Sequence, residues 1–453
     1  MSSRSRNNSA NRGTTRRDFL KTVGVAAGAA GLAPAVSAPF VSTAFAETKT
    51  LKILQWSHFI PEYDRWLDGF ARDWGKKNGI AVTVDHIPHL ELPARAAAEV
   101  SAGSGHDIFG FNGSGGPHLY AKHLFDLTSL VEEIEKKHGQ VLPMGRQIAW
   151  NEETKGWSAF PDYFIDFPGL YRKDLWDEIG MKPDTWEDVR LGGAKLKQKG
   201  NPLGIALSHA VDPNNSYRSM LWSHGASICD ETGKHVTLDS KETVEVVKFV
   251  TALYKEAMDP EVLSWDDAGN NRFLASGRGS WIHNPISAYR SIQKSNPALA
   301  DKIAVWKTPA GTVRRLAAGA PNSYVIWKFA RNKEAAVEFL RYYADHYSEA
   351  FKASTGYDHP LFSNLVPKPM PILSDDPTSH PPDKLKVLET AEEWCVVFGY
   401  PGPSSPAADE VADNFIIPDM MARAATGKAT PEEAVKWGSN EINLIYEKWA
   451  KRS

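Results

Sequence analysis

The stretch FPDYFIDFPGLYRKDLWDEIGMKPDTWEDV, residues 160–189, is the most recognisable part of this 453-residue chain. It ends in Thr185-Trp186-Glu187-Asp188, which resembles a helix capping box with Asp in place of Glu and predicts a helix through Lys199. A second capping box, Thr430-Pro431-Glu432-Glu433, predicts the closing helix. Apolar spacing predicts two more helices, one that begins at Asp239/Ser240 and one over 333–353.

Upstream of this stretch, short apolar runs alternate with amphipathic segments. LKILQW (51–56), IAVTVDHI (80–87) and HDIFGFN (106–112) have strand character, and helical patterns over 61–79 and from Pro93 separate them. A β-α-β-α-β order implies a mainly parallel sheet with helices on both faces. Ligands sit outside the carboxyl ends of such strands. That rule points to the loops at Trp56–Phe59, His89–Leu92 and Asn112–Gly116.

The first 46 residues have the three parts of an export signal. Basic residues lead, an apolar core of Ala, Gly and Val follows at 23–32, and Ala44-Phe45-Ala46 fits an A-x-A cleavage site before Glu47. Arg16-Arg17 followed by Asp18-Phe19-Leu20-Lys21 resembles the twin-arginine signal, which implies export in a folded state. We therefore expect cleavage near Ala46-Glu47 and a periplasmic location.

Charge and cysteine content narrow the function classes. Of 52 basic and 55 acidic residues, six basic and one acidic lie in residues 1–46, so the remainder carries a net charge of −8. An acidic surface argues against nucleic acid and anionic membranes as partners. The two cysteines, Cys229 and Cys395, could form a disulfide or stay buried thiols, and they are too few for an iron–sulfur cluster. We expect no cofactor.

Three motifs in a fixed order carry a resemblance to a known family. They are LYRKDL followed by PDTWE within 170–187, NRFLASGRGSWIHNP at 271–285, and KTPAG with LAAGAPNSYVIWK at 307–328. In this order the chain resembles the extracellular solute-binding proteins of bacterial ABC transporters, in the branch that includes the maltose-binding protein. The resemblance covers essentially all of residues 50–453.

The resemblance implies an α/β fold, the two-lobed periplasmic-binding-protein (type II) clamp with a hinge and an interlobe ligand cleft. The expected parts are the signal at 1–46, one lobe at 47–165 plus 309–357, and a second lobe at 166–308 plus 358–453. Lobes of this kind close over the ligand by a hinge motion. The expected partners are a small solute, most of all a carbohydrate, and a membrane permease. We expect a monomer without catalytic activity.

A sugar site needs aromatic rings for the apolar faces of the ligand, and charged or amide side chains for its hydroxyls. Most of the 15 Trp and 14 Tyr residues should be core; among them we expect Trp66, Trp74 and Trp449, which lie on apolar helix faces. The candidate ligand-binding residues come instead from the cleft loops and the crossing strands: Trp56, Ser57, His58, Glu91, Asn112, Ser114, Asp162, Tyr163, Asp166, Trp281, His283, Asn284, Asn322, Tyr324 and Tyr357. Tyr217 and Trp222 could line the cleft or simply begin a helix.

Other ligands and activities remain open at this stage. Ile286 stands where the maltose-binding branch has an aromatic, and Ile165 stands where it has an acid, which argues against maltodextrin itself. A polyamine is an alternative ligand. An exported glycosidase is an alternative function, and it would need two carboxylates on either side of a scissile bond, for which Glu91, Asp162 and Asp166 are the candidates. We expect no metal site at His86 and His89, because Pro88 breaks any helix that would align them.

Overall fold

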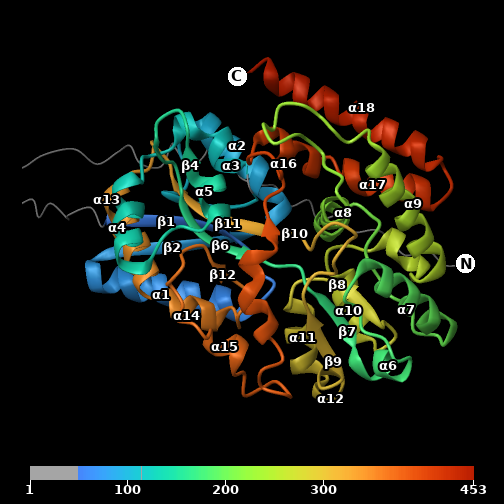
Figure 1. Cartoon of the computed structure of the whole chain (residues 1–453). Helices are drawn as coiled ribbons and strands as arrows, with labels where there is room; N and C mark the ends of the chain where they lie inside the picture. Colours follow the sequence, from blue (N-terminus) through green and yellow to red (C-terminus); the bar gives the residue numbers. More distant parts are fainter. Residues whose placement is uncertain (1–48, 114, 453) are drawn as a thin grey trace, which may run out of the picture. The chain divides into compact units, whose positions relative to one another are not determined.

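A computed structural model describes residues 49–113 and 115–452, which belong to one compact unit (Figure 1). Its larger sheet has six strands in the order β12-β6-β11-β3-β1-β2. Strands β2 and β3 both pair parallel to β1, whereas β11 lies antiparallel between β3 and β6. The strands are β1 (Lys49–Trp56), β2 (Ile80–Ile87), β3 (Ile108–Asn112), β6 (Phe160–Ile165), β11 (Ala320–Ile326) and β12 (His359–Pro360).

The β-α-β-α-β order predicted for the start of the sheet is confirmed. Helix α1 (Pro61–Asn78) begins with proline and ends at Gly79, whose φ of 65° is the left-handed conformation that glycine adopts without a steric penalty. Its buried face includes Leu67, Ala71 and Trp74. These residues follow the period of 3.6 that predicts the helix, and the same face holds it against the sheet.

Seven helices and one short hairpin complete this half of the described chain, which we call lobe 1. The helices are α1, α2 (Leu92–Ala102), α3 (Gly116–Leu119), α4 (Thr128–His138), α5 (Pro143–Ala149), α13 (Lys333–Asp345) and α14 (Tyr347–Ala353), and the hairpin is β4 (Trp150–Asn151) with β5 (Gly156–Trp157). The single helix predicted over 333–353 is wrong in one respect. The chain leaves the helical path at His346, so α13 and α14 are separate helices.

A three-stranded sheet in the order β8-β7-β9 forms the base of the second half, lobe 2. Its elements are β7 (Gly169–Arg172), β8 (Trp281–His283), β9 (Ile303–Trp306), α6 (Lys173–Glu178), α7 (Trp186–Gln198), α8 (Val211–Ser223), α9 (Lys241–Glu256), α10 (Gly269–Ala275), α11 (Ser287–Ser295), α12 (Pro297–Ala300), α16 (Pro406–Asp413), α17 (Ile416–Ala425) and α18 (Pro431–Ala450). Both predicted capping boxes, at Thr185 and Thr430, are present. Ser240 caps α9 as predicted.

The chain passes between the two lobes more than once. Strand β6 continues through residues 166–168 into β7, and the short strand β10 (Ala317–Ala318) precedes β11. Strand β10 pairs in parallel with β13 (Cys395–Val396). The segment 357–382 is mostly irregular: it holds only β12 and the single turn α15 (Pro371–Ser374) before the 3-10 helix η5 (Lys386–Glu393).

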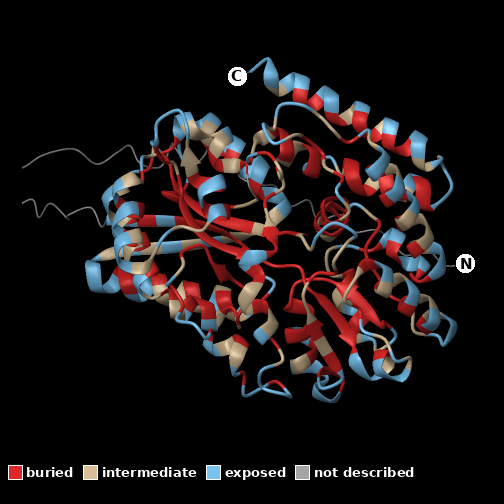
Figure 2. Cartoon of the chain, viewed as in Figure 1, coloured by how far each residue is buried: buried red, intermediate tan, exposed pale blue. Residues whose placement is uncertain are grey.

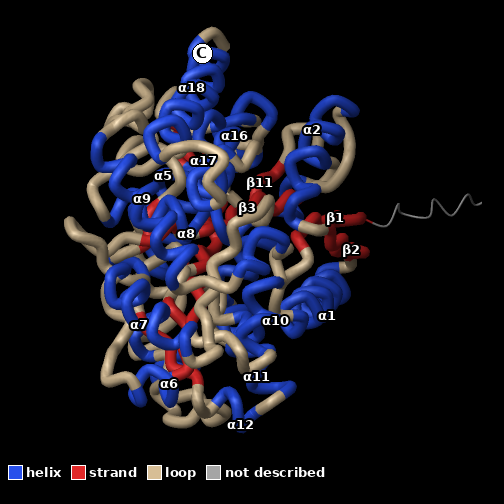
Figure 3. Tube along the Cα trace, turned by 90° about the vertical axis from the view of Figure 1, so that its right-hand side faces the viewer, coloured by secondary structure: helices blue, strands red, loops and turns tan. Residues whose placement is uncertain are grey.

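Burial follows the two sheets. The strands of both are largely buried, and the outer faces of the helices are exposed (Figure 2). Helices α16, α17 and α18 lie against one another at the C-terminal end of the chain (Figure 3). Among residues 49–113 and 115–452, every helix is too short or too polar to span a bilayer. The predicted export signal at 1–46 and its cleavage site lie outside the described residues, so both stay predictions.

Candidate functional site

A cavity of about 610 Å³ lies where the carboxyl end of β3 and the loop after β2 approach lobe 2. Lobe 1 contributes His89, Leu90 and Leu92 from the loop after β2, and Asn112 and Gly113 from the end of β3. Lobe 2 contributes the first turns of α8, one face of α16 and the end of α18. The volume is in the usual range for a small-molecule site. Two of the three loops predicted from the strand-end rule contribute residues to the cavity lining.

Aromatic rings come into the cavity wall from five separate places in the chain. They belong to Phe111, Tyr120, Phe398, Phe415 and Trp449. The rings of Phe111 and Tyr120 are stacked, with centroids 5.8 Å apart and an interplanar angle of 15°. Phe415 has a φ of 53°, a conformation that a bulky residue rarely adopts and that clusters at functional sites. Such rings can cover the apolar C–H faces of a sugar.

Two amide side chains line the cavity from opposite lobes, and each has one unpartnered atom among the described residues. These atoms are Nδ2 of Asn112, at the end of β3, and Oδ1 of Asn215, a fully buried residue of α8. Leaving a buried polar atom without a partner costs about 1–3 kcal/mol. A ligand hydroxyl, which both donates and accepts, can satisfy either atom.

Asn214, the neighbour of Asn215, is held in place by its own hydrogen bonds. Its Oδ1 accepts from Arg218 Nη1 at 2.6 Å, and its Nδ2 donates to the Ala412 carbonyl at 3.0 Å. The first bond lies within α8, and the second joins α8 to α16. They fix the turn of α8 that presents Asn215 to the cavity.

The acidic side chains of the wall all come from α16. The Asp409 carboxylate accepts the backbone N–H of Gly115 at 2.6 Å, a hydrogen bond between the two lobes. Glu410 accepts from Lys448 Nζ at 2.5 and 2.8 Å and from Trp449 Nε1 at 2.6 Å. Burial raises the pKa of Asp413, Arg218 opposes this, and the charge of Glu410 raises it further. The wall is thus rich in acceptors.

Most residues predicted from the sequence lie outside the cavity lining. Asn112 lines it, and Glu91 is an exposed residue of the 3-10 helix η2 (His89–Glu91) beside it. Ser57 is exposed, and Ser114 lies outside the described residues. The other members of the set are buried: Trp56, His58, Asp162, Tyr163, Asp166, Trp281, His283, Asn284, Asn322, Tyr324 and Tyr357.

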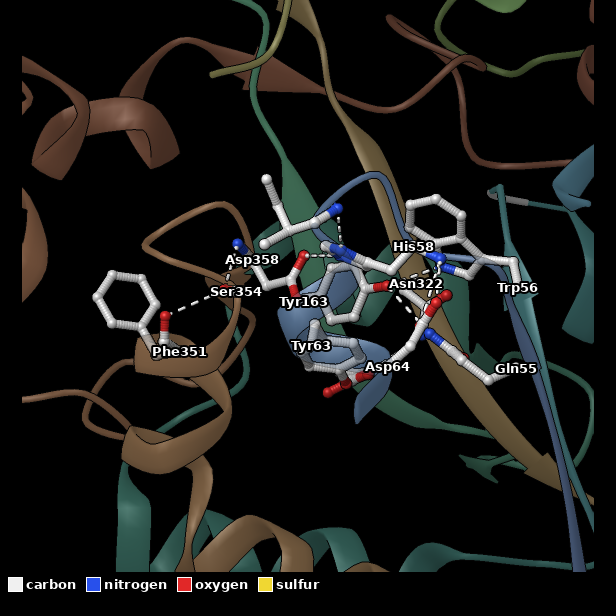
Figure 4. Close-up of polar contacts among 12 residues, drawn as sticks. Gln55, Trp56, His58, Tyr63, Asp64, Tyr163, Asn322, Phe351, Ser354 and Asp358 are labelled. Atoms are coloured by element: carbon white, nitrogen blue, oxygen red, sulfur yellow. Dashed lines mark hydrogen bonds and ion pairs between the residues drawn. The ribbon is translucent and has the colours of Figure 1, made fainter. Parts of the chain in front are cut away.

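Among the buried lobe 1 members, Trp56, His58, Asp162, Tyr163 and Asn322 form a network of hydrogen bonds with neighbouring side chains, part of which Figure 4 shows. Trp56 Nε1 donates to the Tyr163 hydroxyl at 2.8 Å. His58 Nδ1 accepts the N–H of Ile60, which leaves Nε2 to donate to Asp358 Oδ1 at 3.1 Å. The polar groups of Trp56, His58 and Tyr163, which we expected to bind a ligand, are therefore hydrogen-bonded within the protein.

Asp162 has a structural role in the same network. It accepts from the Tyr343 hydroxyl at 3.0 Å and from Asn322 Nδ2 at 3.1 Å. Burial and the nearby charge of Asp358 raise the pKa of Asp162 well above its ordinary value. Neither Asp162 nor Asp166 lines the cavity, and Glu91 is on the surface. The structure therefore does not place the three candidate carboxylates on either side of a common ligand position.

The predicted lobe 2 members are equally enclosed. His283 bonds to the hydroxyl groups of Ser216 at 2.9 Å and Thr308 at 3.0 Å, and burial lowers its pKa to about 3. The amide of Asn284 bonds to Asn270 and Asn271. Both side chains thus fasten β8 to its neighbouring elements.

Most of the cavity lining was missed from the sequence, including Asn215, Phe398, Phe415, Trp449 and the three acidic residues of α16. Trp449 was expected in the core, yet it is half-buried, and its indole N–H bonds to Glu410 in the cavity wall. Tyr217 and Trp222, noted as alternatives, are buried in α8 and do not line the cavity, whereas Asn215, just before Tyr217, does. Among the described residues, no group of three or more His, Cys, Asp or Glu is arranged to hold a metal ion.

Comparisons with known proteins agree on a family. The family model for bacterial extracellular solute-binding proteins matches residues 60–346. A probable ABC transporter-binding protein of Deinococcus radiodurans is 24% identical over 311 residues, which cover 65% of this chain and 72% of that protein.

Solved structures show the same fold. A solute-binding protein of Thermotoga lettingae with bound α-D-tagatose matches with a TM-score of 0.73 and 21% identity, over 88% of this chain and 100% of that one. MalE3 of T. maritima with bound maltose matches with a TM-score of 0.72 and 21% identity, over 87% and 99% of the two chains. The expected type II periplasmic-binding-protein fold is therefore confirmed.

Proposed function

The chain belongs to the bacterial extracellular solute-binding proteins of ABC transporters, and from this premise we propose that it binds a sugar or sugar derivative in the cavity between its lobes. The observation that carries the proposal is the pair of unpartnered amide atoms, on Asn112 from lobe 1 and Asn215 from lobe 2. A saccharide hydroxyl between these two atoms would accept a hydrogen bond from Asn112 Nδ2 and donate one to Asn215 Oδ1, so it would contact both lobes. The five aromatic side chains of the wall would cover its apolar faces.

Ligand binding is proposed to close the two lobes at a hinge. We take lobe 1 as residues 47–165 plus 309–357, and lobe 2 as residues 166–308 plus 358–453. The exception is β12 (His359–Pro360), which follows the last crossing but lies at the edge of the lobe 1 sheet. A ligand that touches both walls binds the closed form more tightly than the open form, and that difference drives closure. The bond from Gly115 to Asp409 is a contact that closure would form.

Export and delivery complete the proposal. The predicted twin-arginine signal would bring the folded protein to the periplasm, where it would pass its ligand to a membrane permease of an ABC importer. The family and the two sugar-bound structures support this role by their similarity to the chain. Catalysis is not part of the proposal.

A thermal-shift screen tests the binding proposal. The purified chain is heated with monosaccharides, oligosaccharides, polyols and polyamines. A ligand present at about 100 times its Kd adds about 2.7 kcal/mol of stability, or several degrees of Tm. A shift with one saccharide class supports the proposal and identifies the class. A shift with polyamines alone, or with nothing in the panel, contradicts it.

A further inference from the structure

The cavity wall has an excess of negative charge. Its lining residues include three carboxylates, Asp409, Glu410 and Asp413, and no lysine or arginine among the described residues. Asp409 and Asp413 are four positions apart on α16, so they lie on one face of that helix, the face toward the cavity.

Two cations offset part of this charge. Lys448 forms an ion pair with Glu410 and neutralises it. Arg218, fully buried behind the wall, lies over the ring of Phe398 at 4.7 Å and interacts electrostatically with both Asp409 and Asp413. Among the described residues that line or back the wall, the Arg218 guanidinium thus faces two carboxylates.

A second feature of the wall is also suited to a hydrogen-bond donor. Oδ1 of Asn215 is an acceptor that lines the same cavity, and its side chain is fully buried without a partner for that atom. Asn215 and Arg218 lie on the same helix, α8.

We propose that the ligand is a saccharide that carries one protonated amino group, held against the Asp409–Asp413 face of α16. This inference rests on the proposed function and narrows it to a substrate class. Hydrogen bonds between charged groups are roughly twice as strong as neutral ones. Carboxylates also bind neutral hydroxyls, so the deciding quantity is the preference for an amine over a hydroxyl at the same ring position.

Calorimetric titration of the purified chain with matched sugar pairs measures this preference. The pairs are D-glucosamine with D-glucose and D-galactosamine with D-galactose. N-acetylated sugars keep the nitrogen and remove its charge. In at least one pair the amine is expected to bind about tenfold more tightly than both its hydroxyl and its N-acetyl counterparts.

A charge variant assigns the preference to α16. Asp413→Asn is expected to reduce the amine-to-hydroxyl affinity ratio to about one. Asp419→Asn is the control, because Asp419 lies on α17 outside this cavity and bonds to His209. If Asp413→Asn leaves the amine-to-hydroxyl affinity ratio unchanged, the assignment of the preference to α16 is overturned.

The outcomes separate this inference from the proposed function. If neutral sugars bind as tightly as their amino counterparts in every pair, the amine requirement is overturned and the sugar-binding proposal stands. If no saccharide binds, charged or neutral, both are overturned. Binding of linear diamines without any amino sugar overturns the saccharide class.

Discussion

Replacing Asp376 by Asn should destabilise the protein more than most single substitutions, because it breaks a buried ion pair. Asp376 pairs with Arg290 of α11, and their side chains are 1% and 4% exposed. Arg290 also donates two hydrogen bonds to the carbonyl of Thr355, at 3.1 and 2.6 Å. Thr355 follows α14 and has a φ of 56°, a strained conformation for a β-branched residue. The pair therefore holds lobe 2 to the turn after α14.

The size of the effect follows from the pKa of Asp376. Burial alone would raise this pKa, but hydrogen bonds from Arg290, Thr378 and Ser379 lower it from its ordinary value of 3.8 to about 2. That difference corresponds to about 2 kcal/mol of stability at neutral pH. Removing one partner of a buried pair costs about 3–5 kcal/mol, because the remaining charge stays buried. We expect a loss of about 3 kcal/mol.

Urea unfolding of wild type and Asp376→Asn at pH 7 measures this loss. Because the folded pKa is depressed, the stabilisation is complete above about pH 3.8 and is lost as pH falls toward 2, so the difference between the proteins should shrink over that range. Glu152→Gln is the control, since its pair with Lys155 is 74% and 71% exposed and should leave stability nearly unchanged. The double variant Arg290→Met/Asp376→Leu should lose less than Asp376→Asn. A loss below about 1 kcal/mol for Asp376→Asn would refute the reasoning.

Three further predictions concern other parts of the described chain. Cys229 and Cys395 are buried free thiols, and burial raises the pKa of both. A thiol reagent should therefore label neither cysteine in the native protein and both in urea. Rapid labelling of the native protein would contradict this prediction. Burial alone would lower the pKa of His86, but Asp64 and Asp68 raise it to about 9. Between pH 6.5 and 9, the free energy of unfolding of wild type should therefore fall by about 1–2 kcal/mol more than that of His86→Gln. Equal unfolding curves for the two proteins would count against this prediction. A Cβ at Gly115 would lie 2.7 Å from the Ser405 carbonyl and 2.8 Å from Asp409. Gly115→Ala should therefore lower ligand affinity at least tenfold, measured by calorimetry, with less than about 1 kcal/mol loss of stability, measured by urea unfolding of the same preparation. Unchanged affinity would contradict this prediction.

Local signals in the sequence predict much of the fold. Leu67 and Trp74 mark the buried face of α1, Gly79 marks its end, and Thr185 and Thr430 mark the starts of α7 and α18. Each signal depends on residues within a few positions of one another. The break at His346 has no comparable signal, because the apolar spacing continues from α13 into α14.

The candidate site was harder to predict, because the partners of its polar groups are distant in sequence. Asp162 lies on the expected crossing strand, β6, but its partners Asn322 and Tyr343 lie 160 and 181 residues away. The sequence cannot tell whether such a carboxylate meets a ligand or a tyrosine. Phe415 and Trp449 reach the cavity only because α16, α17 and α18 lie against one another beside α8.

The most direct test of the account is the affinity of the Asn215→Ala variant for the saccharide found by screening, measured by calorimetry beside wild type. The control is Asn443→Ala, which removes an exposed amide of α18 outside the cavity. Asn215→Ala is expected to weaken binding about tenfold, the equivalent of one ligand hydrogen bond at a buried site, and Asn443→Ala is expected to match wild type. Equal affinity for wild type and Asn215→Ala would contradict the claim that the ligand lies between the amides of the two lobes.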